Sequence, residues 1–402
     1  MNNVPNLRFP EFEGEWEKCK LGDKCDLLCG YAFDGKDIVE QGTYLLMRGI
    51  NITEGIIRHS AELDRYYTGS VNNLTKYKLT TGDLVIGMDG SKVGRNSAIV
   101  SPKENGSYLV QRVCRIKSCI GNDLIFQLVN NHKFHKYVDM VKTSSAIPHI
   151  SLKDIQNFPI AVPSVQKEAD KISRLFHLLD ERIATQNKII EKLQSLIKGL
   201  NNSLYAQYGG KVLTSFAELG TSYSGLFGKS AQDFGSGKPF ITYLNVYSNN
   251  VINENDFQYV AIKDGEKQNV AEYGDVLFTL SSETPKEVGI GSVYLGKEKV
   301  YLNSFCFGIH ITNTEVAFPP FLSYYVSSTA FRKFIYPYAQ GSTRFNLCKA
   351  DFEKASIKLP TLEKQKRIYS ILSHIDSKIE TERQMLDLYN SQKQYLLRHM
   401  FI

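Results

Sequence analysis

The sequence lacks long apolar segments. None of its hydrophobic runs reaches the about 18 residues that a membrane-spanning helix needs, and its first residues, Met1–Asn6, are too polar for a signal peptide. We therefore expect a cytoplasmic protein with no membrane partner. Hydrophobic residues nevertheless make up 42% of the 402 residues, which excludes intrinsic disorder. This length predicts two or three domains.

Paired cysteines are missing as well. The seven cysteines include no Cys-x-x-Cys pair, and no pair of histidines stands beside them at the spacing of zinc ligands. Because disulfides are rare in the cytoplasm, we expect reduced thiols and no metal site. A net charge of +6 decides little, since it suits a phosphate-facing surface and an ordinary solvated surface equally well.

Complete catalytic and nucleotide-binding motifs are also absent. Gly291–Glu298 follows the phosphate-loop pattern until Glu298, which stands where a Ser or Thr would hold magnesium and which would repel phosphate. Gly228-Lys229-Ser230 has Tyr223 in place of the opening glycine of that loop. We therefore predict a non-enzymatic chain that binds no cofactor of its own.

What the sequence does contain is an internal repeat. Segments of the first half match segments of the second half in the same order, at an offset of roughly half the chain. Gly82–Ile86 matches Gly274–Phe278, and Phe158–Pro163 matches Ala355–Pro360. The repeat predicts two similar globular domains.

Within each half, short apolar runs between Gly, Asn and Asp turns predict strands, and longer runs have helical periodicity. Each half is therefore expected to be α+β. The predicted strands include Tyr44–Met47, Leu84–Ile86, Tyr108–Val110 and Val293–Leu295, and the predicted helices are Leu124–Val141 and Pro320–Tyr336.

Each half ends in a helix with one apolar stripe. Its positions are spaced alternately by four and three residues, the heptad pattern of a coiled coil, so we expect the two helices to pair. The alternative is that each amphipathic helix packs only on its own domain. The first stripe comprises Ile172, Phe176, Leu179, Ile183, Gln186, Ile190, Leu193, Ile197, Leu200 and Leu204, and the second comprises Ile368, Leu372, Ile375, Ile379, Glu382, Leu386, Tyr389, Leu396 and Met400, with Lys393 at one further position.

The connections predict that the helices run antiparallel. Only Tyr205–Lys211 separates the first helix from the second globular segment, and parallel helices would need a connection about 50 Å long to lead back. The expected fold is thus two α+β domains, 1–162 and 212–359, joined by antiparallel coiled-coil helices, 163–205 and 360–402, with pseudo-two-fold symmetry. The domains are expected at opposite ends of the paired helices.

Two polar residues interrupt the apolar stripes near their midpoints. Gln186 and Glu382 hold matching positions in the two helices. In a centred antiparallel pair they would lie opposite one another or one layer apart, and each alone against an apolar layer would be costly. We therefore expect them to pair and to fix the register of the helices. The alternative is that both side chains reach solvent.

Two variable halves, each closed by a heptad helix that begins after a proline, resemble the specificity subunit of type I restriction-modification systems. Pro5–Phe12 and Glu15-Trp16-Glu17 look like the start common in that family, as do Gly82–Ile86 and Gly274–Thr279. Pro360–Ile368 is similar to the beginning of the family's helical region. The resemblance covers essentially the whole chain.

The resemblance implies a DNA-binding adaptor. Each half would be a target recognition domain that reads one half of a split, asymmetric site in double-stranded DNA, and the helices would set the gap between the half-sites. Two methylase subunits would dock on the helices, bring S-adenosylmethionine and flip out adenines. Motor-nuclease subunits, with ATP and Mg, would join them for restriction.

Side chains that contact bases in the major groove are typically Arg, Lys, Asn or Gln. The loop Gly90–Asn96 follows a predicted strand and contains three such residues, of which Lys92 and Arg95 are candidates. For each candidate, a solvated loop residue is the alternative. The DNA-binding candidates are Arg48, Arg58, Lys92, Arg95, Arg112, Ser144 and Ser145 in the first half, with Lys286, Thr343 and Arg344 in the second. Among them, Ser144 and Ser145 are expected to donate to phosphate.

Two other functions remain open from the sequence. A methylation-only complex would use the same subunit without a nuclease. A coiled-coil scaffold with no role in DNA reading would share the helices but would bind no duplex.

Overall fold

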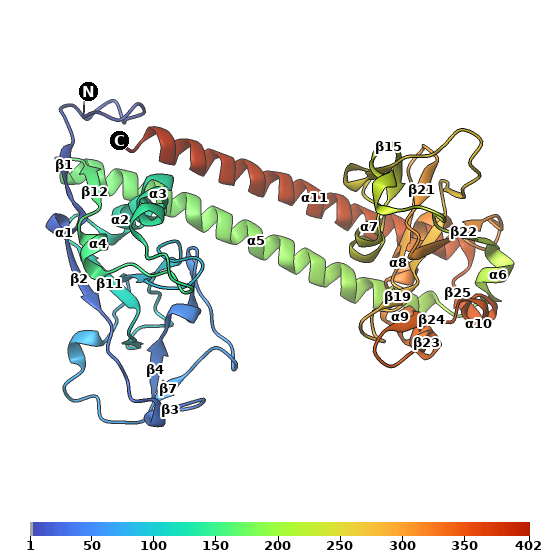
Figure 1. Ribbon diagram of the computed structural model, residues 1–402, viewed down its shortest axis with the longest axis horizontal. Coiled ribbons are helices and arrows are strands. Elements are labelled where there is room, and N and C mark those ends of the chain that lie inside the picture. The colour runs from blue at the N-terminus through green and yellow to red at the C-terminus, as the bar shows by residue number, and fades with distance from the viewer. Residues whose placement is uncertain (1–2) are drawn as a thin grey trace. The chain divides into compact units, whose positions relative to one another are not determined.

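The computed structural model describes residues 3–402, which form two compact units. Unit 1 combines the chain up to Asn187 with Gln384–Ile402, and unit 2 is Lys188–Arg383. The two long helices, α5 (Gln166–Tyr208) and α11 (Leu362–His399), both cross from one unit into the other (Figure 1). Each unit therefore contains part of each long helix. Residues 1 and 2 of the polar N-terminal segment lie outside the described residues.

Unit 1 is built on a four-stranded antiparallel sheet in the order β2-β11-β8-β9, with a second four-stranded sheet in the order β10-β4-β7-β3. A separate pair, β1 with β12, leads into α5. The bounds are β1 Glu17–Lys20, β2 Cys25–Cys29, β3 Ile38–Val39, β4 Tyr44–Met47, β7 Tyr66–Tyr67, β8 Leu84–Gly87, β9 Ser97–Ile99, β10 Tyr108–Leu109, β11 Val113–Ser118 and β12 Pro159–Val162.

The helical stretch predicted at 124–141 is two helices, α2 (Asn122–Val129) and α3 (His132–Val141). The break lies at Asn131, whose side chain accepts from the backbone N–H of Lys133 at 3.1 Å and donates to the carbonyl of Leu397 at 3.0 Å. Such side-chain caps begin a new helix. The expectation of one continuous helix is therefore wrong, although the helical character is right.

Unit 2 repeats this plan. Its sheet β14-β22-β18-β20 corresponds to β2-β11-β8-β9, and β13 pairs with β25 as β1 pairs with β12. Two further sheets have the orders β16-β15-β21-β17 and β19-β24-β23. The bounds are β13 Val212–Thr214, β14 Gly220–Ser224, β15 Phe234–Ile241, β16 Gln258–Val260, β17 Val270–Ala271, β18 Val276–Thr279, β19 Ser281–Ser282, β20 Gly291–Val293, β21 Val300–Leu302, β22 Cys306–Ile311, β23 Ala339–Gln340, β24 Phe345–Leu347 and β25 Ile357–Leu359.

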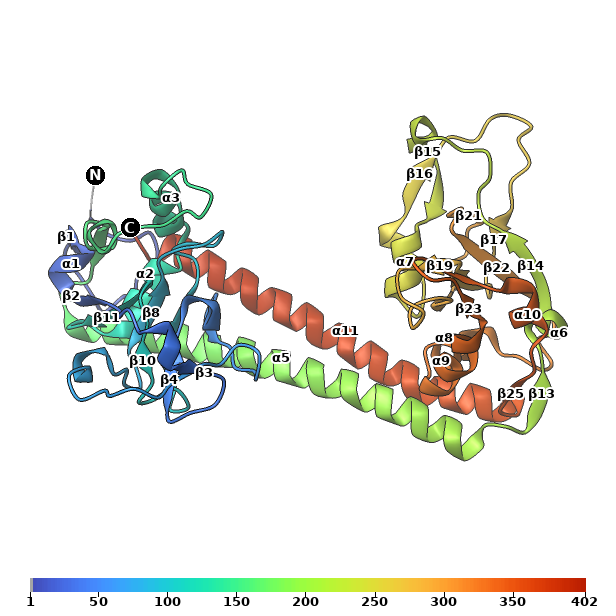
Figure 2. The ribbon, with the colours of Figure 1, turned by 60° about the horizontal axis from the view of Figure 1, so that its bottom comes forward.

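The stretch predicted as a helix at 320–336 is likewise divided, into α8 (Pro319–Val326) and α9 (Thr329–Ile335). The hydroxyl of Ser328 caps α9 by accepting from the N–H of Phe331 at 3.1 Å. Buried α8 side chains share one apolar core with the sheet and with α11, and Figure 2 shows α8 beside the long helices.

The repeated Gly-Asp motif is a turn before the central strand of each sheet. Gly82 and Gly274 have φ values of 89° and 92°, which favour glycine. The following carboxylates are almost completely buried and accept from a backbone N–H three residues earlier, Asp83 from Thr80 and Asp275 from Glu272, both at 2.9 Å. The motif therefore has a structural role in both units.

The long helices pack antiparallel within each unit. In unit 1, Phe176 of α5 contacts Phe401, which follows α11, and Lys393 of α11 forms an ion pair with Asp180 of α5. In unit 2, the core that contains Ile368 and Leu372 includes the last turns of α5. All predicted stripe residues are buried or partly buried. The predicted α+β fold with two repeated halves and paired long helices is confirmed.

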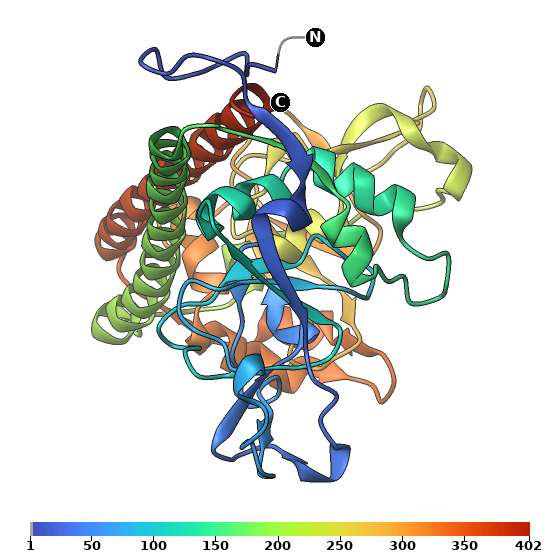
Figure 3. The ribbon, with the colours of Figure 1, turned by 90° about the vertical axis from the view of Figure 1, so that its left-hand side faces the viewer.

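The N-terminal segment of unit 1 lies against the end of α11, as Figure 3 shows. The N–H of Leu7 donates to the carbonyl of His399 at 2.8 Å, and the ring of Trp16 packs edge-on against Phe401. Both ends of the chain therefore contribute to one core.

All seven cysteines are free thiols. Within residues 3–402, no cluster of three or more His, Cys, Asp or Glu side chains is placed to hold a metal ion. No helix of this described part combines the length and the apolar character that crossing a bilayer requires.

Candidate nucleic-acid interface

In unit 1, the turn between β10 and β11 presents Arg112 at the edge of the sheet. The carbonyl of Arg112 accepts from the N–H of Met88 at 2.9 Å, and Gly30 donates to the carbonyl of Val113 at 2.9 Å. The side chain of Arg112 is exposed and has no hydrogen-bond or ion-pair partner among residues 3–402. Its φ of 68° is left-handed, a conformation that costs a non-glycine residue about 1–2 kcal/mol.

Unit 2 contains the same turn between β21 and β22. The carbonyl of Phe305 accepts from the N–H of Leu280 at 2.9 Å, and Gly225 donates to the carbonyl of Cys306 at 3.1 Å. These bonds match those of Arg112 and Gly30 one repeat earlier. Phe305 is 56% exposed.

A glycine allows the close approach of this turn in both units. A Cβ atom on Gly30 would lie 2.1 Å from the carbonyl oxygen of Val110, and one on Gly225 would lie 2.0 Å from that of Asn303. Both distances are far below van der Waals contact. The repeat therefore extends to the hydrogen bonds and the glycine contact around the two turns, while the left-handed φ is found at Arg112 and not at Phe305.

Three further loops flank the turn in unit 1, and we call the four segments together loop edge 1: 49–58, 89–96, 110–112 and 143–149. The N–H of Gly90 donates to the carbonyl of Pro148 at 3.0 Å, which joins two of the loops. A polar hollow of about 530 Å³ lies between the first two loops and is lined by Arg58 and Lys92, among others.

In unit 2, the corresponding loop edge 2 comprises 281–289, 303–305 and 339–346. Ser281 pairs with Asn346 across β19 and β24, as Asp89 bridges to His149 in unit 1. The guanidinium of Arg344 lies 5.8 Å from the centre of the Phe305 ring, within the range of a cation–π contact.

The candidate DNA-binding residues are not equally available. Lys286, Thr343, Arg344 and Arg112 are exposed on the loop edges. Ser144 and Ser145 lie in the loop 143–149, where the hydroxyl of Ser145 donates to the carbonyl of Ile147 at 2.7 Å.

Three of the candidate arginines have partners inside unit 1. The guanidinium of Arg48 donates to the carbonyl of Leu63, and burial lowers its pKa. Arg95 donates to Asp139 at 2.6 Å, and this bond, together with Lys142, lowers the pKa of the Asp139 carboxyl to about 2. Both arginines therefore help to hold the loops in place. Arg58 donates to the carbonyl of Ile50 at 3.2 Å, which leaves part of its guanidinium for other contacts.

Phe305 is a surface residue that the charge-based search of the sequence missed. The signal in the sequence that marks Phe305 is the internal repeat, because Phe305 holds the position in the second half that Arg112 holds in the first.

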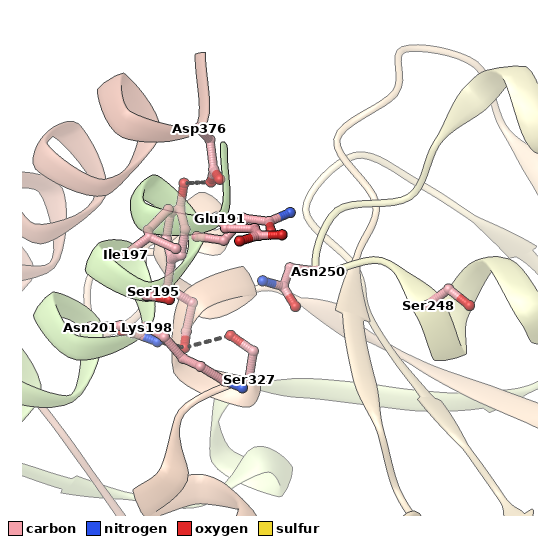
Figure 4. Close-up of a pocket in the computed structure, with 11 residues that line it drawn as sticks. Glu191, Ser195, Ile197, Lys198, Asn201, Ser248, Asn250, Ser327 and Asp376 are labelled. Carbon is pink, nitrogen blue, oxygen red and sulfur yellow. Dashed lines mark hydrogen bonds between the residues drawn. The ribbon is translucent and has the colours of Figure 1, made fainter. Parts of the chain in front are cut away.

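A polar groove of about 840 Å³ lies in unit 2 between α5, α8, α11 and the end of α7 (Tyr243–Ser248). Figure 4 shows Glu191 of α5 and Asn250, which follows α7, facing one another across it. The hydroxyl of Tyr324 donates to Asp376 at one end of the groove.

The repeat indicates a structural role for the Tyr324–Asp376 pair. At matching positions in unit 1, Gln127 donates to Asp180 at 3.0 Å. In both units this hydrogen bond joins a short helix to a long one. Because the Gln127 amide, which does not titrate, takes the place of the Tyr324 phenol, the bond needs no acid–base chemistry to explain it.

The lysine of Gly228-Lys229-Ser230, one of the two incomplete phosphate loops, has partners within unit 2. Lys229 is almost fully buried, donates to the carbonyl of Ala261 at 2.6 Å and pairs with Glu266 at 2.6 Å. The ammonium group therefore serves the fold of unit 2.

Gln186 and Glu382, the polar pair expected at the helix midpoints, are both buried. Gln186 is 7% exposed and Glu382 is 9% exposed, and Glu382 forms an ion pair with Lys378 one turn earlier on α11. Both are largely shielded from solvent. That they pair with one another stays a prediction.

Comparison with known proteins points to one family. The family model "Type I restriction modification DNA specificity domain" matches residues 13–195 and again 223–388. The specificity subunit of the type I restriction enzyme EcoAI from Escherichia coli is 29% identical over 181 residues, which are 43% of this chain. The matched part spans only 29% of that relative's length.

Solved structures show the same fold. The S subunit of a type I restriction-modification system from M. genitalium superposes with a TM-score of 0.60 at 13% identity, over 99% of both chains. A chain from a study of complex assembly and conformational transition of the type I R-M system has a TM-score of 0.55 at 15% identity, over 95% of this chain and 96% of its own. Because the family model matches twice, once in each half of the internal repeat, the chain belongs to the type I restriction-modification DNA specificity family.

Proposed function

We propose that the chain is the DNA-reading subunit of a type I restriction-modification complex and has no catalytic activity of its own. Each globular part, 1–162 and 212–359, is a target recognition domain that reads one half of a bipartite, asymmetric site in double-stranded DNA. The observation that carries this proposal is the repeated turn, which presents an exposed residue, Arg112 or Phe305, held by repeat-related backbone hydrogen bonds on both loop edges.

The long helices have a different part in this proposal. Since α5 and α11 are shared by both units, they set the distance between the half-sites. They also offer a surface on which methylase subunits, two in the simplest symmetric arrangement, dock. S-adenosylmethionine belongs to those subunits, and ATP and Mg belong to the motor-nuclease subunits.

Methylome sequencing of cells with and without this chain tests the proposal. We expect one bipartite adenine-methylation motif to disappear when the chain is deleted and to return when it is restored. An unchanged methylome would contradict the proposal. Cleavage of unmethylated DNA that contains the motif distinguishes a restricting complex from a methylation-only one.

A coiled-coil scaffold is the second candidate, supported by the length of α5 and α11. The full chain, purified with the subunits that accompany it, separates the two candidates. Failure to retain any duplex from a random library, with those subunits still bound, would favour the scaffold.

A further inference from the structure

We propose that Arg112 and Phe305 are equivalent base-contacting residues, Arg112 for a guanine in one half-site and Phe305 for a thymine in the other. This inference rests on the proposed function and assigns its sequence specificity to one position in each unit.

The first argument is the shared backbone. The carbonyls of Arg112 and Phe305 accept from repeat-related N–H groups, and a glycine closes the turn in both units. The same hydrogen bonds thus hold an exposed side chain at one place in both units, and that side chain is a cation in unit 1 and an aromatic ring in unit 2. This arrangement is suited to reading different bases.

The second argument concerns Arg112. It is the one non-glycine residue with a positive φ in the described part of the chain, although glycine would relieve the strain there. The bond from Met88 fixes this conformation, and the guanidinium has no partner within residues 3–402. A strained turn, held by this backbone bond, therefore presents a free, forked donor group. Such a group matches the O6 and N7 acceptors of guanine in the major groove.

The third argument concerns Phe305. Its ring is 56% exposed on loop edge 2 and is therefore accessible to a base. The contact with the Arg344 guanidinium places a cation beside the ring. An apolar ring suits the methyl group of thymine, and the adjacent guanidinium suits a neighbouring phosphate.

Selection from a randomised duplex library tests this assignment. The probes are the full chain, purified with its accompanying subunits, and the variants Arg112→Gly and Phe305→Ala. We expect Arg112→Gly to lose the preference for guanine at one position of one half-site. Phe305→Ala is expected to lose the preference for thymine at one position of the other half-site. The variants Lys153→Ala and Lys297→Ala, which change exposed residues outside both loop edges, serve as controls that keep both preferences.

Base analogues then test the contacts directly. Replacing the selected guanine by 7-deazaguanine, or the selected thymine by deoxyuridine, should weaken binding of the unmodified protein roughly five- to hundredfold. The same replacement should not further weaken the variant that lacks the matching side chain. An analogue that weakens protein and variant equally would overturn the contact.

The outcomes separate this inference from the proposed function. If the unmodified protein selects no consensus, the proposed function fails. If it selects one and both variants keep it, the assignment fails and the proposed function stands.

Because glycine relieves the positive φ, Arg112→Gly should melt at the same temperature or higher. A lower melting temperature with loss of the whole consensus would show a structural role and overturn the assignment of Arg112. Phe305→Leu, which keeps an apolar group, should retain part of the thymine preference, and its complete loss would overturn the methyl contact.

Discussion

The guanidinium of Arg8 and the carboxylate of Glu168 form two hydrogen bonds, each 2.7 Å long, within unit 1. The Glu168 side chain is completely buried and also accepts from the indole N–H of Trp16 at 3.2 Å. The matching residue of unit 2, Gln365, is equally buried but bonds to backbone groups, including the N–H of Phe318 at 2.8 Å. One buried position thus uses an ion pair in one repeat and a neutral amide in the other.

We expect Glu168→Ala to lower the free energy of unfolding by about 3 kcal/mol, because it leaves the largely shielded guanidinium of Arg8 with only the carbonyls of Glu13 and Gly14 as partners. Urea unfolding followed by circular dichroism measures the change. Glu181→Ala, which removes an exposed carboxylate from the same helix, is the control and should change stability by less than about 0.5 kcal/mol. If the two substitutions lower the free energy of unfolding equally, the pair of Arg8 and Glu168 stabilises the fold no more than an exposed carboxylate does.

The sequence predicts the large features of this fold because they leave periodic or repeated signals. The heptad stripes of α5 and α11 predict the long helices, and the matched segments predict two similar units. The breaks at Asn131 and Ser328 leave no such signal, since each depends on a side chain that caps the backbone. The bond between Arg8 and Glu168 joins residues far apart in the chain, and periodicity carries no information about such contacts.

The ion pair of Lys229 with Glu266 predicts sensitivity to acid. The bond from Lys229 lowers the pKa of the Glu266 carboxyl to about 2. Because the folded-state pKa lies below the ordinary value of 4.5, this stabilisation is complete above pH 4.5 and is lost as the pH falls toward 2. We expect Glu266→Gln to be less stable than the unmodified protein at pH 7 and the difference to shrink between pH 4.5 and 3. Urea unfolding at several pH values measures it.

The control for this experiment is Glu283→Gln, which changes an exposed glutamate of unit 2. It should leave the pH dependence of stability as it is. A difference between Glu266→Gln and the unmodified protein that stays constant from pH 7 to 3 would contradict the assigned ion pair.

The candidate interface is only partly readable from the sequence. Charge and turn residues point to the loops that contain Lys92 and Arg344, but they do not reveal that Arg48 and Arg95 have partners within the fold. Those partners, a carbonyl and a carboxylate from other elements, come from tertiary structure. Phe305 carries no charge, and only its place in the repeat marks it.

These partners lead to different expectations for Lys92 and Arg95. Lys92 is 63% exposed in its side chain and pairs with an equally exposed Glu54 at 3.0 Å, a contact that contributes little in water. If Lys92 contacts a phosphate, Lys92→Ala should reduce the slope of log affinity against log salt by about 1. Changing both residues to alanine should weaken binding by about 1–3 kcal/mol, with the larger share from Lys92.

Fluorescence anisotropy with a cognate duplex at several salt concentrations measures both quantities. Lys153→Ala removes an exposed lysine from α4 (Leu152–Gln156), outside loop edge 1, and should leave the slope unchanged. If Lys92→Ala behaves like this control, Lys92 belongs to the solvated surface.

Specificity should be exchangeable between family members one half at a time. The segment 212–355 begins at β13 and ends just before β25, and these two strands form an antiparallel pair. Both junctions of an exchanged segment therefore meet at one place, where pairing depends on backbone hydrogen bonds that tolerate a change of side chains.

We expect replacement of 212–355 by the corresponding segment of another family member to change one half of the methylated motif and to leave the other half and the spacer as they are. Methylome sequencing of cells that carry the chimera gives the result. A donor that shares the second half-site is the matched control and should leave the whole motif unchanged. If the first donor changes both half-sites together, the two units do not read DNA independently.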